Sequence, residues 1–330
     1  MPVWRWMELA NARYYAGRDP FGADGDFITA PEVSQMFGEL VGLWAADLVL
    51  RAGTGDAAWV ELGPGRGTLT RDALAAMAGV GLTPDAHLVE TSPALRRAQG
   101  RAVPTARWHD EVDTLPTDQP LLVVANEFFD ALPVQQLVRE AAGWRERQVD
   151  HSASDGFRPV VGPAVAEATL PEPVRRAPIG AVWESAPAGL TIARRLGERI
   201  AQQGGALLAI DYGYEGPAWG DTLQAVRAHE PVSPWEEPGE RDLTAHVDFA
   251  ALSETLAGAG LSVQGPVGQG EWLERLGLGP RAHALARANP ERTDEIAGQA
   301  ERLAGEGEMG TLFRVLAARA PGWPEAEGFG

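Results

Sequence analysis

A glycine-rich turn at residues 61–68 has the sequence E-L-G-P-G-R-G-T and lies between a predicted strand and a predicted helix. Glycine lets a backbone turn tightly and approach a ligand where a side chain would clash. A dinucleotide-binding turn needs the spacing G-x-G-x-x-G, whose third glycine would fall at Thr68, whereas it falls here at Gly67. This spacing favours S-adenosylmethionine, which has no pyrophosphate, although a purely structural turn has similar glycines. The candidate cofactor-binding residues are Glu61, Gly63, Pro64, Gly65, Gly67 and Thr68.

Two further acidic residues follow predicted strands. Glu90 ends the strand at residues 86–90, and Asp110 follows a weaker strand at residues 106–109. A carboxylate in the position of Glu90 accepts hydrogen bonds from ribose hydroxyls in nucleotide-binding α/β folds, and the alternative is a solvated strand end. We predict that Glu90 binds the ribose and that Asp110 reaches the adenine.

A polar and aromatic segment follows the most apolar strand, residues 121–125. It contains Asn126, Glu127 and Asp130 beside two phenylalanines. Leaving such polar groups buried and unpaired costs about 1–3 kcal/mol each, so we expect them to face solvent or a ligand. Because the glycine turn lies at the same edge of the predicted sheet, we interpret Asn126 as a cofactor contact and Glu127 and Asp130 as substrate contacts.

A second polar pair, His246 and Asp248, precedes a predicted helix. These residues can orient a substrate or receive a proton, and the alternative is that they cap the helix. Near the N-terminus, Tyr14, Tyr15 and Phe27 can shield a site from water, although single exposed aromatic residues need no such role.

The elements that position these residues alternate between strands and helices, which predicts an α/β fold. Ligands in such folds bind beyond the carboxyl ends of the strands. Before this region, residues 1–25 are predicted to be irregular. Apolar residues at helical spacing then predict a helix that begins after Thr29, where Thr29 and Glu32 have capping-box spacing, and ends at Gly53.

Two long segments interrupt the alternation. Residues 134–205 contain a predicted β-hairpin and a helix, and residues 213–247 are too long for a simple connection. The predicted organisation is therefore an N-terminal lid and helix (1–55), a cofactor-binding half (56–133), an insertion (134–205) and a second half with a substrate loop (206–330).

The composition excludes several classes of protein. The 330 residues include 46 acidic and 28 basic side chains, a net charge of −18, which disfavours nucleic acid and favours a cationic peptide as partner. Without cysteine there is no disulfide or thiolate metal site, and the six histidines predict no metal site. The absence of a long apolar segment and of a signal-peptide pattern predicts a soluble, cytoplasmic protein without a membrane span.

Longer motifs resemble the MidA family over essentially the whole chain. They lie at residues 25–39, 61–68, 89–96, 126–133, 210–214, 222–227 and 242–249. The resemblance implies a class I S-adenosylmethionine-dependent methyltransferase, with a Rossmann-like seven-stranded sheet and an inserted subdomain on the substrate side. Mitochondrial members of the family are protein arginine methyltransferases in the assembly of respiratory complex I. The resemblance therefore implies an arginine-bearing protein substrate, with a complex I subunit as the expected partner.

Three alternatives remain at this stage. An assembly chaperone would bind the cofactor structurally and use the two long segments as its contact surface. A methyltransferase for small molecules or nucleic acids would keep the fold, but the net charge disfavours nucleic acid and residues 126–129 lack the sequence N-P-P-Y. An NAD-dependent oxidoreductase is disfavoured because position 68 is threonine.

Overall fold

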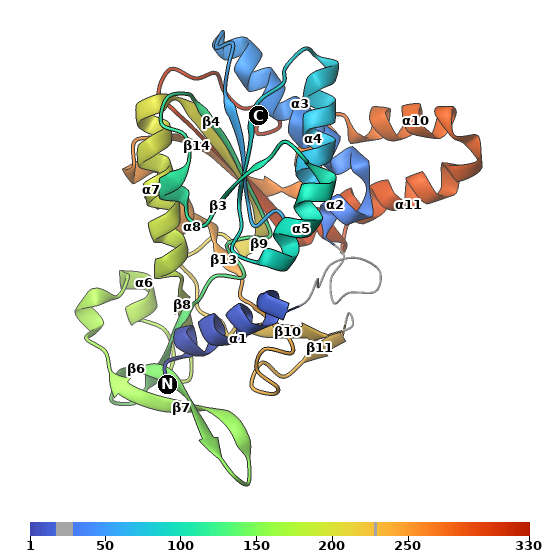
Figure 1. Ribbon diagram of the computed structural model, residues 1–330. Coiled ribbons are helices and arrows are strands. Elements are labelled where there is room, and N and C mark those ends of the chain that lie inside the picture. Colours follow the sequence, from blue (N-terminus) through green and yellow to red (C-terminus); the bar gives the residue numbers. More distant parts are fainter. Residues whose placement is uncertain (18–28, 228–229) are drawn as a thin grey trace.

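The computed structural model describes residues 1–17, 29–227 and 230–330 (Figure 1). Residues 18–28 lie outside the described residues; they include Phe27 and much of the predicted N-terminal lid. Within the described residues, none of the helices has the length and apolar character needed to cross a lipid bilayer.

A central sheet of seven strands, with one short additional strand, organises the molecule. Its order is β14-β15-β9-β4-β1-β2-β3, and the short β13 pairs with the end of β9. Strands β1 to β4 and β9 run parallel, whereas β15 is antiparallel to both of its neighbours. The strands are β1 Ala58–Leu62, β2 Ala86–Val89, β3 Arg107–His109, β4 Leu121–Asn126, β9 Gly205–Tyr214, β13 Val247–Asp248, β14 Ser262–Gly268 and β15 Phe313–Arg319.

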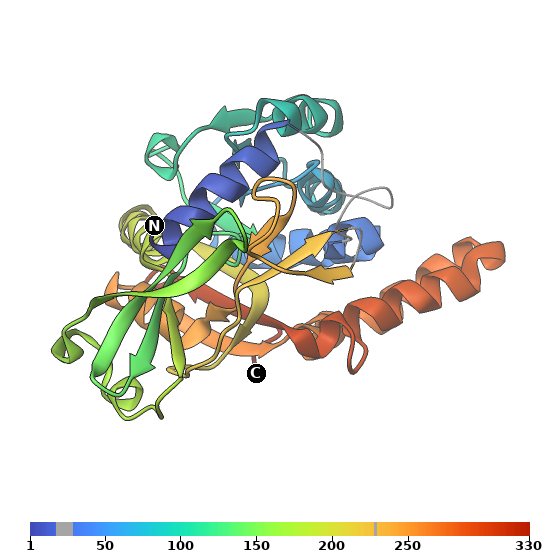
Figure 2. The same cartoon turned by 90° about the horizontal axis from the view of Figure 1, so that it is seen from below.

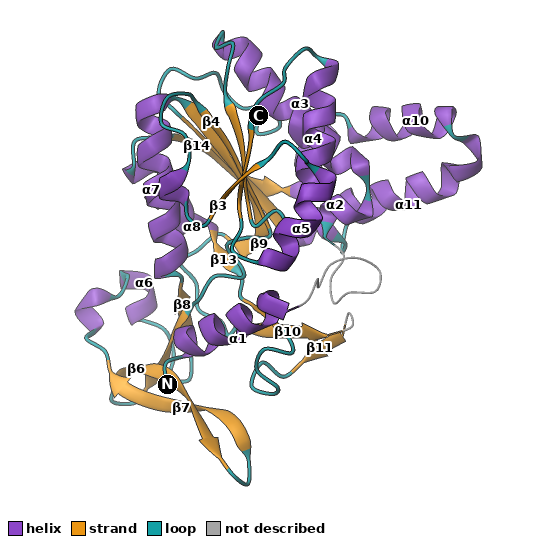
Figure 3. Cartoon of the chain, viewed as in Figure 1, coloured by secondary structure: helices purple, strands orange, loops and turns teal. Residues whose placement is uncertain are grey.

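Helices cover both faces of this sheet (Figures 1 and 3). The central strands β1 and β4 are buried along their whole lengths, which explains their nearly continuous apolar sequences. Strand β1 pairs with β2 on one side and with β4 on the other, so the order in which strands follow one another across the sheet reverses at β1. In open α/β sheets, ligands bind at such a point. The covering helices are α3 Gln35–Ala52, α4 Thr68–Gly79 and α5 Pro93–Ala102 on one face, and α7 Pro187–Gln203 and α8 Phe249–Gly258 on the other. The predicted Rossmann-like class I fold is confirmed.

The helix predicted to begin after Thr29 is divided in two by Ser34. A short helix, α2 Ala30–Val33, precedes the extended Ser34, whose hydroxyl accepts a hydrogen bond from the Met36 amide at the start of α3. The Thr29 side chain makes no capping hydrogen bond, so the predicted capping box does not form. Gly53 ends α3 in a left-handed conformation, as expected.

The N-terminal segment is helical, so the prediction of an irregular chain there is wrong. Helix α1, Val3–Gly17, buries one row of apolar side chains at helical spacing. They pack in a second apolar cluster with residues of the insertion and of the segment 223–245, apart from the main core. The members from α1 are Val3, Trp6, Met7 and Ala10; Tyr14 of the same helix is also buried.

Two smaller sheets lie below the central sheet, on the side of the N-terminus in Figure 1, and are seen from below in Figure 2. One has the order β7-β6-β5-β8 and contains the predicted hairpin; the other has the order β11-β10-β12. Helix α7 packs into the main core, so the inserted layer itself ends before α7. These strands are β5 Gln135–Glu140, β6 Gly143–Ser152, β7 Gly156–Ala164, β8 Val182–Ser185, β10 Gln224–Arg227, β11 Glu230–Val232 and β12 Asp242–Thr244.

A helical hairpin projects from the other side of the molecule (Figures 1 and 2). It consists of α10 Leu278–Ala288 and α11 Thr293–Ala304, and Arg281 fixes its base through a two-pronged ion pair with Glu39 of α3, at 2.6 and 2.7 Å. The remaining short helices are α6 Glu172–Arg175, α9 Gln269–Arg275, α12 Met309–Leu312 and the 3-10 turns at Val112–Thr114, Glu167–Thr169 and Pro290–Arg292.

Candidate functional site

The glycine turn after β1 adopts a backbone conformation that other residues rarely take. Gly63, Gly65 and Gly67 have φ values of 58°, 50° and 84°. A Cβ added at Gly63 would lie 3.1 Å from the ring of Phe128, so a side chain there would also crowd the neighbouring loop. Gly67 is the N-cap residue of α4, whose first amides point toward the turn. The turn therefore presents bare backbone to the space beside it.

Glu61 is a buried carboxyl group inside the apolar strand β1. It accepts a hydrogen bond from the Thr70 hydroxyl, which in turn accepts one from the Trp59 indole at 2.8 Å. Burial raises the pKa of Glu61 to about 7. A buried carboxylate requires a compensating positive partner, and an ammonium group meets that requirement.

Glu90, directly after β2, is held by two donors. The Ser92 amide donates to Glu90 Oε1 at 2.7 Å and the Gln99 amide group donates to Oε2 at 3.2 Å. Burial raises the pKa of Glu90. A carboxylate can accept about four hydrogen bonds, so capacity remains for a pair of hydroxyls.

Gln99 is a structural link that the sequence did not reveal. Its amide group also donates to the Gly65 carbonyl at 2.8 Å, and its own oxygen accepts from the Trp108 indole at 2.8 Å. Gln99 thus connects the glycine turn to Glu90 and fixes their spacing. The only local signal was its position on the helix that follows Glu90.

Asp110 lies on the rim and not among the buried groups. Its carboxylate pairs with Arg96 at 2.7 Å, and its side chain is 81% exposed. Arg96 also donates to the Glu90 carbonyl at 2.7 Å, which explains why this arginine lies there. A contact between Asp110 and adenine stays a prediction.

Asn126 and Glu127 lie at the end of β4, beside the glycine turn. The Asn126 amide group donates to Glu127 Oε1 at 3.2 Å, and the buried Asn126 Oδ1 has no hydrogen-bond partner within the described residues. Glu127 Oε1 also accepts the Ala30 amide at 3.4 Å. Burial, aided by the negative charge of Asp130, raises the pKa of Glu127 to about 8. Glu127 has a φ of 50°, a strained conformation for a residue with a side chain, and such strain concentrates at functional sites.

Asp211 in β9 shapes the loop that carries these acids. Its Oδ2 accepts three successive backbone amides, from Phe128 at 3.2 Å, Phe129 at 2.9 Å and Asp130 at 3.2 Å. Asp130 itself is buried, and burial raises its pKa to about 7. No sequence pattern indicates this contact, because Asp211 is far from the loop along the chain.

These elements enclose one small cavity. Its lining combines the glycine turn, the end of β4 and the start of α2, including Glu61, Gly63, Asn126 and Glu127. Glu32 joins it by accepting a hydrogen bond from Thr68 at 2.6 Å. The structure therefore brings together residues from 29–32, 61–69 and 126–127, whereas the side chain of Asp130 is not part of this lining.

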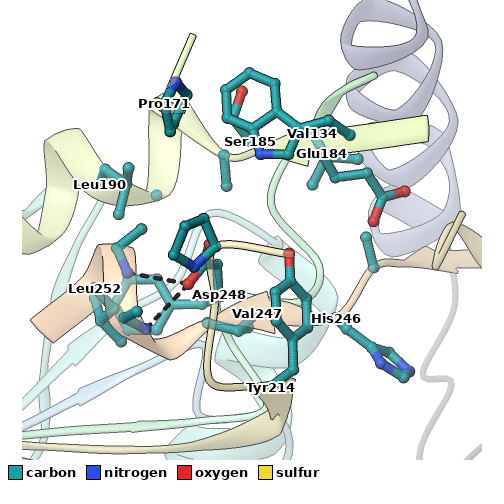
Figure 4. A pocket seen from close by; sticks show the side chains of 18 of the residues that line it. Val134, Pro171, Glu184, Ser185, Leu190, Tyr214, His246, Val247, Asp248 and Leu252 are labelled. Carbon is teal, nitrogen blue, oxygen red and sulfur yellow. Dashed lines mark hydrogen bonds between the residues drawn. The ribbon is translucent and has the colours of Figure 1, made fainter. Parts of the chain in front are cut away.

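His246 and Asp248 line a different cavity, of about 450 Å³, to which Phe129 and Val134 also belong (Figure 4). Asp248 Oδ1 caps α8 by accepting the amides of Ala250 at 3.0 Å and Ala251 at 3.1 Å. The His246 ring is stacked at 6.5 Å on Tyr212. The capping alternative therefore accounts for Asp248.

Comparison with known proteins agrees with this geometry. A family described as "Putative S-adenosyl-L-methionine-dependent methyltransferase" matches residues 40–267. The chain belongs to this family. The mitochondrial protein arginine methyltransferase NDUFAF7 homologue of Drosophila melanogaster is 36% identical to it, over 96% of this chain and 81% of that one. NDUFAF7 of Mus musculus is 35% identical, over 92% and 76% of the two chains.

Two solved structures of similar proteins have the same fold. A COG1565 superfamily member from Burkholderia thailandensis, bound to S-adenosyl-homocysteine, has a TM-score of 0.88 and 29% identity, over 99% of this chain and 89% of that one. A native crystal structure of a protein of this superfamily from the same organism has a TM-score of 0.84. The predicted family, its enzymatic class and its use of S-adenosylmethionine are confirmed.

The site at the glycine turn fits this cofactor. Gly63 leaves open the space that a Cβ would fill, and the unpaired Oδ1 of Asn126 offers an acceptor in the cavity. The contacts of Glu61 with the ammonium group and of Glu90 with the ribose hydroxyls stay predictions. The sequence singled out these residues because each lies at or beside the end of a parallel strand at one edge of the sheet.

Proposed function

We propose that this enzyme methylates arginine side chains of a protein substrate, and that the acceptor is a subunit of respiratory complex I. The names of its relatives support the first part, since several are protein arginine methyltransferases. The observation that carries the proposal is the pair of buried acids, Glu127 and Asp130, directly after the strand beside the glycine turn.

Two positive charges must meet in such a reaction. The guanidinium group is always charged, and S-adenosylmethionine supplies an electrophilic methyl group on a cationic sulfur. At about 4 Å and an effective dielectric constant of about 20, their repulsion is on the order of 4 kcal/mol. The carboxylates of Glu127 and Asp130 offset this repulsion and align the planar guanidinium through paired hydrogen bonds.

The raised pKa values match a second task. Without a cation nearby, burial keeps Glu127 largely protonated at neutral pH, because its pKa is about 8. An approaching guanidinium favours the carboxylate form and lowers this pKa. The guanidinium nitrogen attacks the methyl carbon as the sulfur–methyl bond breaks, and this nitrogen must lose a proton. In this proposal Glu127 accepts that proton as a general base.

Replacing Glu127 tests the proposal directly. We expect Glu127→Gln to bind S-adenosylhomocysteine with nearly wild-type affinity and to lose methyl transfer by about 100-fold or more, within the usual range for a general base. Isothermal titration calorimetry measures the first quantity, and transfer of a radiolabelled methyl group to acceptor protein measures the second.

The exposed Glu111→Gln, at the same edge of the sheet, serves as the matched control and keeps both properties. A fully active Glu127→Gln enzyme would show that the acceptor is held elsewhere. A wild-type protein that binds the cofactor but methylates no arginine would favour the assembly-chaperone alternative.

The acceptor and the location need separate tests. We expect mass spectrometry of cells with and without the gene to show a methylarginine on a complex I subunit that depends on the gene. The sequence predicts a cytoplasmic protein, whereas its animal relatives are named mitochondrial proteins. Microscopy of the protein fused to a fluorescent marker at its C-terminus tests this location.

A further inference from the structure

The cavity of about 450 Å³ has no role in the proposed chemistry so far. It lies between the inserted layer and α8, beyond the end of β9. Figure 4 shows Pro171 and Leu190 on one side of it, with Tyr214, Val247 and Leu252 on the other. This volume is within the range of ligand-binding cavities and exceeds the space that one aliphatic side chain needs.

The polar groups of the lining are mostly occupied. Glu184 accepts hydrogen bonds from Gln136 at 2.6 Å, from the Leu223 amide at 3.2 Å and from the Thr222 hydroxyl. The carboxylate of Asp248 is used by the first amides of α8. What remains for an occupant is therefore predominantly apolar wall.

The charge of the lining adds a second restriction. None of its residues, all of which belong to the described part of the chain, is a lysine or an arginine. His246 is the one histidine of the lining, and burial lowers its pKa, which favours the neutral ring. Carboxylates of Glu184, Asp248 and Glu254 belong to the lining, so an acidic occupant is disfavoured.

The cavity borders the loop that carries Glu127 and Asp130. Phe129 forms part of its wall and lies between Glu127 and Asp130 in the chain. The Cα atoms of Glu127 and Phe129 are at most about 7.6 Å apart, the length of two peptide units. Ala245, also in the wall, donates its amide to the Asp130 carbonyl at 2.9 Å.

We propose that this cavity binds an apolar side chain of the acceptor protein, located about two to four residues from the methylated arginine. An extended peptide advances about 3.3 Å per residue, so two to four residues cover about 7–13 Å, a range that reaches from Glu127 to a wall residue as near as Phe129. The inference rests on the proposed function, and it adds a sequence requirement to it: an uncharged or basic context with one large apolar residue.

A peptide scan tests this requirement. The probes are fluorescein-labelled nine-residue peptides with one central arginine in a glycine and serine background, in which leucine replaces each other position in turn. Binding is measured by fluorescence anisotropy with the protein saturated with S-adenosylhomocysteine. We expect leucine at one or two offsets to tighten binding about 10-fold, the effect of burying one such side chain.

Variants that fill the cavity identify where leucine binds. Leu190→Trp and Ala251→Phe, from opposite walls, abolish the benefit of leucine, whereas Thr191→Trp, on the exposed face of the same helix α7, retains it. Thermal unfolding and S-adenosylhomocysteine affinity of each variant report whether the fold and the cofactor site are intact. Two filling variants are used so that the conclusion does not depend on one variant that fails to fold.

The outcomes separate this inference from the proposed function. Leucine that tightens binding less than threefold at every offset, or a benefit that survives both filling variants, would overturn the inference. Replacement of the central arginine by glutamine tests the proposed function independently. If that replacement leaves affinity unchanged while leucine still matters, the arginine specificity fails and the apolar cavity stands.

Discussion

Asp211 is the residue on which the geometry of the candidate site depends most. One of its oxygens accepts three consecutive amides of the loop after β4, and the other accepts the Tyr212 amide at 3.0 Å. This arrangement fixes the loop in the conformation in which Glu127 has a positive φ. The role of Asp211 is thus to position other residues.

Replacing Asp211 should therefore destabilise the protein. Asn has one acceptor oxygen where Asp has two, so Asp211→Asn leaves at least one buried amide unpaired, at a cost of about 1–3 kcal/mol in the free energy of unfolding. Urea denaturation measures this loss. The exposed Asp118→Asn is the control and stays at wild-type stability; equal stability of the two variants would show that the amide contacts contribute little.

Residue-level prediction placed side chains correctly where they lie at the edge of the sheet. Glu61, Glu90, Asn126 and Glu127 could be placed there because each lies at or beside the carboxyl end of a parallel strand, and their roles stay predictions. Gln99 and Asp211 were missed because their partners are set by tertiary packing, which leaves no local pattern. For Asp248 the sequence allowed two roles, and only the structure shows the helix cap.

At the level of elements, the turn between β1 and α4 has three glycines with positive φ and is the predicted cofactor contact. We expect Gly63→Ala to weaken S-adenosylhomocysteine binding about 10-fold. A left-handed conformation costs a residue with a Cβ about 1–2 kcal/mol, and this Cβ would crowd Phe128 at 3.1 Å. Calorimetry measures the affinity.

Gly79→Ala, at the end of α4, is the matched control for this turn. An added Cβ meets no atom within 4 Å there, and alanine is the better helix former, so cofactor affinity stays unchanged. Equal affinities of the two variants would show that the turn adapts to a side chain without loss.

The elements of the central sheet could be predicted because strands and helices alternate with clear apolar patterns. Helix α1 was missed although its signal was present: Val3, Trp6, Met7, Ala10 and Tyr14 recur at helical spacing. Many aromatic residues and adjacent glycines are also typical of irregular segments, which favoured the other interpretation. The break at Ser34 had no such signal, because the apolar residues continue through it at helical spacing.

At the level of the whole molecule, buried acids make stability depend on pH. Burial raises the pKa values of Glu61, Asp130 and Glu127 to about 7, 7 and 8. In the unfolded chain these groups ionise near pH 4, so between about pH 4 and 8 the folded state binds more protons. Stability is therefore fully present below the unfolded pKa values and decreases as pH rises through the folded ones.

We expect the melting temperature of the protein, measured by calorimetry without cofactor, to fall as the pH rises from 5 to 8. The negative charge of Asp242 also raises the pKa of Glu127, and the charges of Asp130 and Glu127 raise that of Asp211, so repulsion among these carboxylates adds to the effect of burial. In Glu127→Gln the slope should be shallower because one of the titrating groups is gone. An identical slope in the variant would mean that Glu127 does not titrate in this range.

Helix α1 has a practical consequence for dividing this enzyme into fragments. Its Asn11 bonds to Ala131 at 3.0 Å and to Leu243 at 2.8 Å, while Ser92 donates to the Tyr15 carbonyl at 2.8 Å. The first seventeen residues thus connect segments that lie far apart along the chain. If the protein were divided into two fragments between the cofactor-binding half and the insertion, this helix would keep only some of its contacts. Fragments meant to reassemble should therefore be separated at an exposed hairpin turn instead.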